Sequence, residues 1–311
     1  MLPPFALLCL SIAIIESMAG ILGAGIILAV SSLSCMGSKT WPPYDLIMVS
    51  LSSSRFILQS WTTLDLFFDI LQECSDCEEN IFVVFRPIYM ALNCSGLWFG
   101  AWLSVFYCVK VASFTEPFFI WLKQRIARLV PWMLLTSWLC CITISIPFAL
   151  HVYRVHNNFT APSSLTNSST MRTSGKDSLT LLIYLGNAST ALPLILSVVS
   201  SVLLVRSLWI HTRQMQNNAS GFRDPSLQAH MKAIKAVCSF LILYIIYFIS
   251  LILLLSCDFL PLSDAESICE VLLDACPTGH TLVLIWSNPK FQELPARILH
   301  HINFHVRTAS M

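Results

Sequence analysis

Residues 97–126 of the chain read LWFGAWLSVFYCVKVASFTEPFFIWLKQRI. The first part is apolar enough to form a helix that crosses a bilayer. The apolar helix pattern ends after Lys110. Residues 113–115 interrupt it, and Pro117 then begins an aromatic segment that carries Lys123 and Arg125. A spanning helix that runs into a basic, aromatic segment marks a membrane boundary, with the positive side in the cytosol. This stretch therefore orients the chain and indicates where it would touch an intracellular partner.

The composition indicates a chain that is solvated by lipid. Hydrophobic residues make up 56% of the 311 residues and charged residues 11%, and the mean hydropathy is +0.71. A soluble domain has about 25% charged residues, so this chain has too few to cover a water-facing surface. The formal net charge of +1 argues against nucleic acid as a partner, because phosphate binding needs a basic face.

Seven apolar stretches follow one another, each close to or above the ~20 residues that a spanning helix needs. They cover residues 5–33, 45–71, 82–112, 130–152, 179–205, 234–256 and 268–287. The first is longer than the core of a signal peptide, roughly 7–15 residues, and is expected to be retained as a span. The expected fold is an all-α membrane protein: one seven-helix transmembrane domain over residues 1–311, with residues 288–311 as a short tail.

The basic residues sort by side of the membrane. The first, third and fifth connections and the tail collect Lys39, Lys110, Lys123, Arg125, Arg128, Arg206, Arg213, Arg223, Lys232, Lys235, Lys290, Arg297 and Arg307. The other side holds Arg86, Arg154, Arg172 and Lys176. This Lys/Arg bias predicts that the N-terminus lies outside and the C-terminus in the cytosol.

The connections on the opposite side predict modification and leave the cysteine pairing open. Asn158 and Asn167 begin N-x-S/T acceptor patterns in one polar connection that the charge rule places outside, so glycosylation is expected at both. Four cysteines lie in or beside outer connections, where disulfides and free thiols both remain open; they are Cys74, Cys77, Cys257 and Cys269.

The motifs of catalysis and metal binding are not found in the sequence. There is no nucleophile elbow, P-loop or HExxH pattern. A structural zinc site needs four ligands, which the single C-x-x-C of Cys74 and Cys77 does not supply. His300, His301 and His305 have helical spacing in the tail, where an exposed turn is favoured over a metal site. The sequence predicts no enzyme activity, no cofactor and no metal.

Several motifs, in order along almost the whole chain, resemble the type 2 taste receptors, which are bitter receptors of the G-protein-coupled class. The third-helix and second-loop match is the stretch quoted above. The others are ESMAGILG at 16–23, LSSSRF at 51–56, SLWIHTRQM at 207–215, GFRDPSLQAHMKAIK at 221–235, PTGH at 277–280 and NPK at 288–290. The chain departs from the usual family pattern at Ala24, at Glu116 and at Phe291-Gln292. Ala24 puts in doubt the usual polar contact between the first, second and seventh helices.

Charge inside the membrane predicts a polar network between helices. A charged side chain near the bilayer centre costs about 2.5–3.5 kcal/mol on insertion scales, so Arg55 is expected to face the bundle. Glu16, in the neighbouring helix, is a candidate ion-pair partner. His280, which follows Gly279 in the seventh helix, is expected to face the bundle in a structural or switch role. Arg55 is expected to act as a structural clamp or, alternatively, as part of a switch between helices one, two and seven.

A small-molecule pocket is expected in the outer half of the bundle. Tyr89 and Asn93 share one helix face because they are spaced i, i+4, and Tyr247 lies at a similar depth. Asp65 and Glu270 lie near the outer ends of their helices. The resemblance implies that Tyr89, Asn93, Tyr247 and Glu270 contact agonists. Asp65 and Glu270 are expected either to favour cationic or hydrogen-bond-donating compounds or to face water.

The resemblance implies a receptor at the plasma membrane that binds bitter small molecules and activates a heterotrimeric G protein of the gustducin or inhibitory type. The expected contact surface for the G protein includes Lys110, Glu116, Lys123, Arg125, Arg213, Lys232 and Lys235. Glu116 is an acid in an otherwise basic loop and is expected to weaken or retune coupling. The alternatives are a vomeronasal-type receptor and, in a different class, a small transporter or a structural membrane protein.

Overall fold

The computed structural model describes residues 4–36, 41–70, 75–112, 116–160, 168–218, 225–256 and 263–291. For most residues of 65–86, 151–181 and 211–233 the backbone alone is described. These ranges form seven α-helices: α1 Pro4–Met36, α2 Pro43–Ile70, α3 Ser75–Val111, α4 Pro117–Thr160, α5 Ser168–Asn218, α6 Pro225–Ser256 and α7 Asp264–Ser287. The helices run beyond the predicted spans, most of all α4 and α5.

The helix starts follow from local sequence. Four helices, α1, α2, α4 and α6, begin at a proline, a residue that fits the first helical position because its fixed φ is helical and its missing N–H would be unpaired there anyway. The start of α7 is capped instead. The Ser263 hydroxyl accepts a hydrogen bond from the backbone N–H of Glu266 at 3.3 Å, and acidic residues in the first turn favour the positive helix end.

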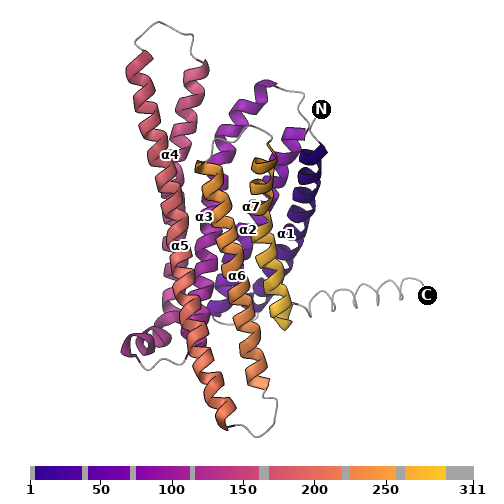
Figure 1. Ribbon diagram of the computed structural model, residues 1–311, viewed down its shortest axis with the longest axis vertical. Helices are drawn as coiled ribbons and strands as arrows, with labels where there is room; N and C mark the ends of the chain where they lie inside the picture. Colours follow the sequence, from indigo (N-terminus) through magenta and orange to yellow (C-terminus); the bar gives the residue numbers. More distant parts are fainter. Residues whose placement is uncertain are drawn as a thin grey trace, which may run out of the picture.

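The helices form an upright bundle whose N-terminal end is the upper end in Figure 1. α1 packs against α2 and α7, α3 packs against α2, α4 and α5, and α6 packs against α5 and α7. The upper parts of α4 and α5 project above the other helices, and α5 and α6 extend below them (Figure 1). α3 therefore lies at the centre of the contacts.

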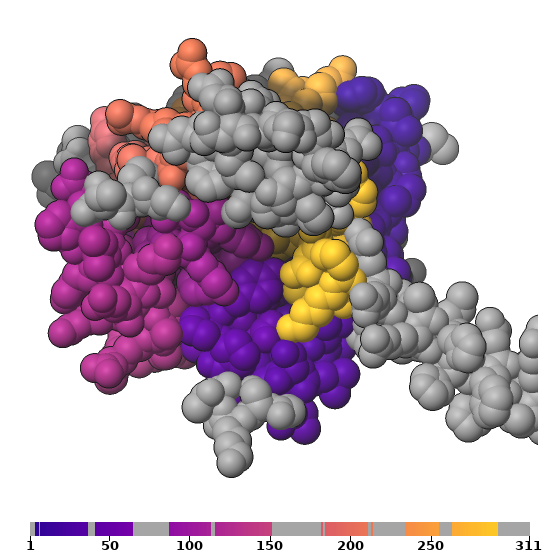
Figure 2. Space-filling view, turned by 90° about the horizontal axis from the view of Figure 1, so that it is seen from below, coloured from indigo at the N-terminus to yellow at the C-terminus, as the bar shows by residue number. Residues whose placement is uncertain are grey.

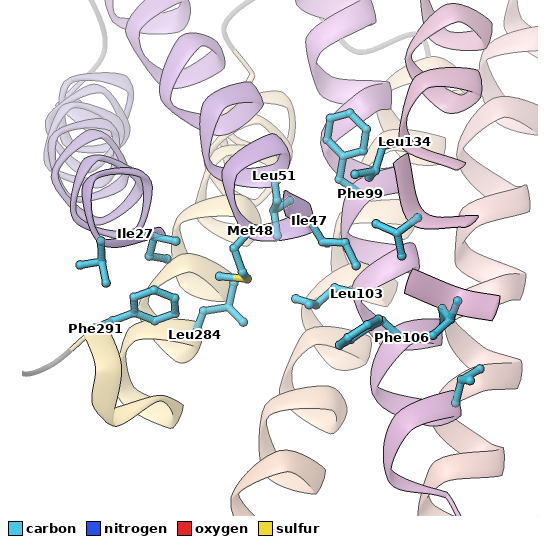
Figure 3. Close-up of a cluster of buried hydrophobic side chains, with 14 residues drawn as sticks. Ile27, Ile47, Met48, Leu51, Phe99, Leu103, Phe106, Leu134, Leu284 and Phe291 are labelled. Carbon is cyan, nitrogen blue, oxygen red and sulfur yellow. The ribbon is translucent and has the colours of Figure 1, made fainter. Parts of the chain in front are cut away.

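The largest buried apolar cluster ties five helices together. Ile27, Met48, Leu284 and Phe291 meet where α1, α2 and the chain after α7 come together, and Phe99, Leu103, Phe106 and Leu134 continue the cluster between α3 and α4 (Figure 3). Phe291 is fully buried, so the residue that departs from the family pattern fills the core here. A second cluster joins α6 and α7 around Phe240, Tyr244 and Tyr247.

The outer surface of the helices is apolar, as a lipid-facing surface must be. Exposed large hydrophobic residues include Ile15, Leu22, Trp132, Ile195, Val202 and Ile242. Within the described ranges, six helices are long and apolar enough to cross a membrane. The remaining helix, α2, carries Asp45 and Arg55 in a sequence rich in serine and threonine. The predicted all-α, multi-span membrane fold is confirmed.

Candidate functional site

A cavity lies at mid-height in the bundle, between α2, α3, α6 and α7. Asn93 lies midway along α3, and the other lining residues lie near the middle of their helices. The lining consists of Arg55, Leu58, Asn93, Gly96, Leu97, Phe240, Leu243, Tyr244, Tyr247, Cys276, Pro277 and His280. A mostly apolar wall with a few placed polar groups is typical of a small-molecule site.

A hydrogen bond crosses the upper part of this cavity from α3 to α6. The Asn93 side-chain amide donates to the Tyr247 hydroxyl, and both side chains are buried. One turn away on α6, the Tyr244 hydroxyl donates to the backbone carbonyl of Thr190 at 3.1 Å and so holds α5. The polar groups that face the cavity are therefore anchored to three helices.

The floor of the cavity is formed by Arg55 and His280. The Arg55 guanidinium donates to Nδ1 of His280 at 2.6 Å and to the Thr281 hydroxyl at 3.0 Å. Because Nδ1 accepts this bond, the ring proton of a neutral His280 belongs on Nε2. The Phe240 ring covers the imidazole, with 4.3 Å between the ring centroids. These contacts link α2 to α7.

The candidate pairing of Arg55 with Glu16 is not found, because Arg55 bonds to His280 and Thr281 of α7 instead. The Glu16 backbone carbonyl accepts from the Thr278 hydroxyl at 3.3 Å, and the same Thr278 hydroxyl accepts from the Gln59 amide at 3.3 Å. The Glu16 carboxylate leaves one oxygen, Oε2, buried with no hydrogen-bond partner. Sequence spacing placed these residues on neighbouring helices but did not give the helix rotations that choose the partner.

A second polar cluster, at the lower end of the bundle, was not predicted. The buried Asp45 carboxylate accepts from Lys290 at 2.7 Å and from the Ser34 hydroxyl at 2.9 Å. The Tyr44 hydroxyl accepts from the Asn288 amide at 3.0 Å and from the Tyr107 hydroxyl at 3.4 Å.

The lower polar cluster, defined by these residues, joins α1, α2, α3 and the end of α7. Figure 2, which views the molecule from below, shows the end of α7 (yellow) beside α2 (purple). Charged residues are rare in this chain, so the sequence signal for this cluster was the presence of Asp45 at the start of α2 and of Lys290 after α7.

The residues predicted to contact a G protein are exposed wherever their side chains are described. Lys110 lies over the Phe106 ring at 5.5 Å, and Arg125 lies over Trp121 at 5.3 Å. Trp121 stacks on Phe118. Glu116 precedes α4, and its backbone carbonyl accepts from the N–H groups of residues 119 and 120. The remaining exposed members of this set are Lys123, Arg213 and Lys235.

Other predicted site residues lie away from the cavity or outside the described side chains. Tyr89 is half-buried and Glu270 is exposed, and neither lines the cavity. The side chains of Asp65, Lys232 and Asn158, as well as Asn167 as a whole, lie outside the described part of the chain, as do Cys74, Cys257 and the side chain of Cys77.

Sequence reasoning missed the aromatic wall of the cavity. Phe240 and Tyr244 precede the predicted Tyr247 at spacings of seven and three residues, and they share its face of α6. The spacing was visible in the sequence. What it lacked was the position of α7, whose His280 and Cys276 close the other side.

Comparison with known proteins identifies the family. The family model "Taste receptor protein (TAS2R)" matches residues 1–303. The chain is 56% identical over 303 residues to "Taste receptor type 2 member 40" of Gallus gallus, covering 97% of each chain. It is 35% identical over 289 residues to "Taste receptor type 2 member 39" of Homo sapiens, covering 93% of this chain and 85% of the relative.

A more distant similarity points the same way. "Taste receptor type 2 member 1" of Chlorocebus aethiops is 34% identical over 296 residues, covering 93% of this chain and 95% of that relative. The match to the family model extends over nearly the whole chain, including every described helix. The chain therefore belongs to the type 2 taste receptors, the non-enzymatic seven-helix receptors of bitter taste, which are multi-pass proteins of the cell membrane that couple to G proteins.

Proposed function

We propose that the mid-bundle cavity is the site where bitter agonists bind. The observation that carries this proposal is the combination of apolar walls with the Asn93–Tyr247 hydrogen bond inside the mid-bundle cavity. An apolar ligand gains from burial against Leu97 and Phe240, and one placed polar group gains specificity from the amide or the hydroxyl. The cavity lies lower than the outer-half pocket expected from sequence.

The acids near the upper end give the site a charge preference. Glu270 is exposed on α7 and Asp65 lies on α2. An agonist that enters the bundle from its upper end passes both acids before it reaches the cavity. We infer from the Lys/Arg bias that this end lies outside the cell. The acids would favour cationic or hydrogen-bond-donating agonists. Agonist responses that are unchanged by Asp65→Asn and Glu270→Gln would remove this part of the proposal.

The lower end is the proposed surface for a G protein of the gustducin or inhibitory type. Its support is the exposed basic set, Lys110, Lys123, Arg125, Arg213 and Lys235, to which Lys232 is added from sequence. Glu116 places a negative charge beside them. Glu116→Gln should therefore increase coupling at an unchanged agonist EC50, and a decrease would contradict its proposed role.

Activation is proposed to be a population shift. An agonist changes the equilibrium between inactive and active bundles only by its differential affinity for the two. Arg55 and His280 join α2 to α7 directly below the ligand, so they would serve as a switch or as a clamp; Glu16 retains a proposed role beside Gln59 and Thr278. An Arg55→Ala receptor that reaches the surface and signals normally would contradict both roles. Glycosylation is proposed at Asn158 and Asn167.

The agonist site is tested by filling the cavity. Leu97→Trp adds bulk inside the cavity, whereas Leu135→Trp makes the same change on the exposed side of α4. In cells that express a taste G protein, calcium responses to a bitter-compound panel should shift to at least tenfold higher EC50 for Leu97→Trp, since overpacking by about 1.4 kcal/mol is enough for this factor. The Leu135→Trp responses should not shift. Equal responses from both variants at equal surface expression would refute the proposed site.

A further inference from the structure

The inner end of the cavity carries a buried positive charge that the described residues do not balance. Arg55 is 7% exposed. Its hydrogen-bond partners in the described ranges are His280 and Thr281, which are neutral acceptors. The ion pair found among the described side chains joins Lys290 to Asp45 at the lower end of the bundle. Arg55 therefore keeps its full charge in a low-dielectric interior, where an unpaired ion is costly.

The carboxylates nearest to the cavity lie on its upper side, where they form a group of acids separate from Arg55 and His280. Asp274 interacts electrostatically with Glu16 and Glu270 and lies near Tyr247. It precedes His280 by six residues, or about 9 Å along α7 at 1.5 Å per residue. The acids therefore crowd one another above the cavity while the cation lies at its floor.

The chemistry at this floor is that of a donor. A guanidinium has five N–H groups and no acceptor, and two of its donors are directed to His280 and Thr281. The bond to Nδ1 leaves the imidazole with its proton on Nε2, a second donor. Phe240 covers the imidazole ring, and the cavity wall beyond is apolar. A cation with additional donors and apolar walls is the environment that desolvates and holds a monovalent anion.

We propose that the inner end of the cavity, formed by Arg55 and His280, is an anion subsite that takes a chloride ion or the carboxylate of a small organic molecule. The bound anion neutralises the guanidinium and stabilises the folded bundle. The inference rests on the cavity proposed above as the agonist site but not on its use by agonists, so stabilisation by an anion can be observed even where the agonist experiment fails.

The test measures Tm of the purified full-length receptor in detergent. Sodium gluconate, whose polyhydroxyl chain does not match the apolar cavity wall, is replaced by sodium chloride at constant ionic strength. In a second arm, benzoate is compared with the neutral benzamide. A site filled to tenfold above its Kd should raise Tm by about 3 °C, since binding then adds about 1.4 kcal/mol. A rise with chloride identifies an inorganic ion, and a rise with benzoate but with neither chloride nor benzamide identifies an organic carboxylate.

Matched variants separate this site from general salt effects. Arg55→Gln should lose the anion-dependent rise, Arg55→Lys should retain it, and Arg206→Gln, which removes an exposed arginine of α5, should not change it. If Arg55→Gln does not fold, the wild-type series decides alone. Equal Tm values in chloride, gluconate, benzoate and benzamide, or an anion response that persists in Arg55→Gln, would overturn the proposal.

Discussion

A methyl group added at Gly20 should force α1 away from α7. A Cβ at this position would lie 2.7 Å from the Thr278 hydroxyl oxygen and 3.1 Å from Cγ of Gln59. The first distance is far below the normal separation of about 3.5 Å between non-bonded heavy atoms. The hydroxyl cannot retreat without cost, because it donates to the Glu16 carbonyl and accepts from Gln59.

The magnitude follows from these contacts. Displacing the hydroxyl weakens two hydrogen bonds, each contributing about 0.5–1.5 kcal/mol, and overpacking at a tight contact costs about 1–3 kcal/mol. The two bonds are weakened rather than lost, and alanine is the better helix former by about 1 kcal/mol. Gly20→Ala should therefore destabilise the receptor by about 1–3 kcal/mol net, which corresponds to a Tm about 2–6 °C lower at roughly 2 °C per kcal/mol.

Gly25→Ala is the matched control on the same helix. A Cβ at Gly25 would lie 3.7 Å from the Phe56 ring, an ordinary contact, and alanine is the better helix former by about 1 kcal/mol. This variant should keep or raise Tm. Intrinsic fluorescence melting of the two purified variants measures the difference. A Tm for Gly20→Ala equal to or above that of Gly25→Ala would show that the α1–α7 contact is looser than the packing described above.

Two further paired predictions concern the stability of the purified receptor. Trp102→Phe and Trp98→Phe remove the same ring atoms, but only Trp102→Phe also loses an indole N–H bond, to the Ser137 hydroxyl at 2.8 Å; the buried indole nitrogen of Trp98 has no partner. Trp102→Phe should therefore cost about 1 kcal/mol more than Trp98→Phe. The reverse order in a melting experiment would be inconsistent with these bonds. Lys290→Met leaves the Asp45 carboxylate, 5% exposed, without its cation and should cost about 1–3 kcal/mol. Asp45→Asn should cost less, because it leaves a partly exposed lysine that water can solvate. Chemical denaturation of both variants decides the order.

The fold was predictable because its signal lies in single segments. A run such as 234–256 is long and apolar, and in a bilayer its backbone has few alternatives to a helix. The family was predictable for a related reason, since short motifs such as PTGH at 277–280 occur in order along the chain. Helix lengths were less predictable, because α4 and α5 continue as helices through polar sequence that a hydropathy argument ends early.

The site was predictable residue by residue but not as a set of partners. Asn93 and Tyr247 were expected near each other and do form a hydrogen bond. Arg55 was expected to need a partner, but the choice of His280 over Glu16 depends on helix rotation. The i, i+4 spacing put Tyr89 and Asn93 on one face, yet only Asn93 lines the cavity. A shared face does not give the depth at which neighbouring helices leave space.

The hydrogen bond between Asn93 and Tyr247 has a consequence for how one receptor answers dissimilar compounds. The two groups satisfy each other across the cavity, so an agonist at the proposed site would have to accommodate or displace their hydrogen bond. A compound need not match a detailed template to do this, because bulk at that height, or a single donor or acceptor, would compete with the Asn93–Tyr247 bond. Many dissimilar compounds would therefore be able to break this hydrogen bond, but the free energy needed to break it would raise the agonist concentration at which the receptor responds.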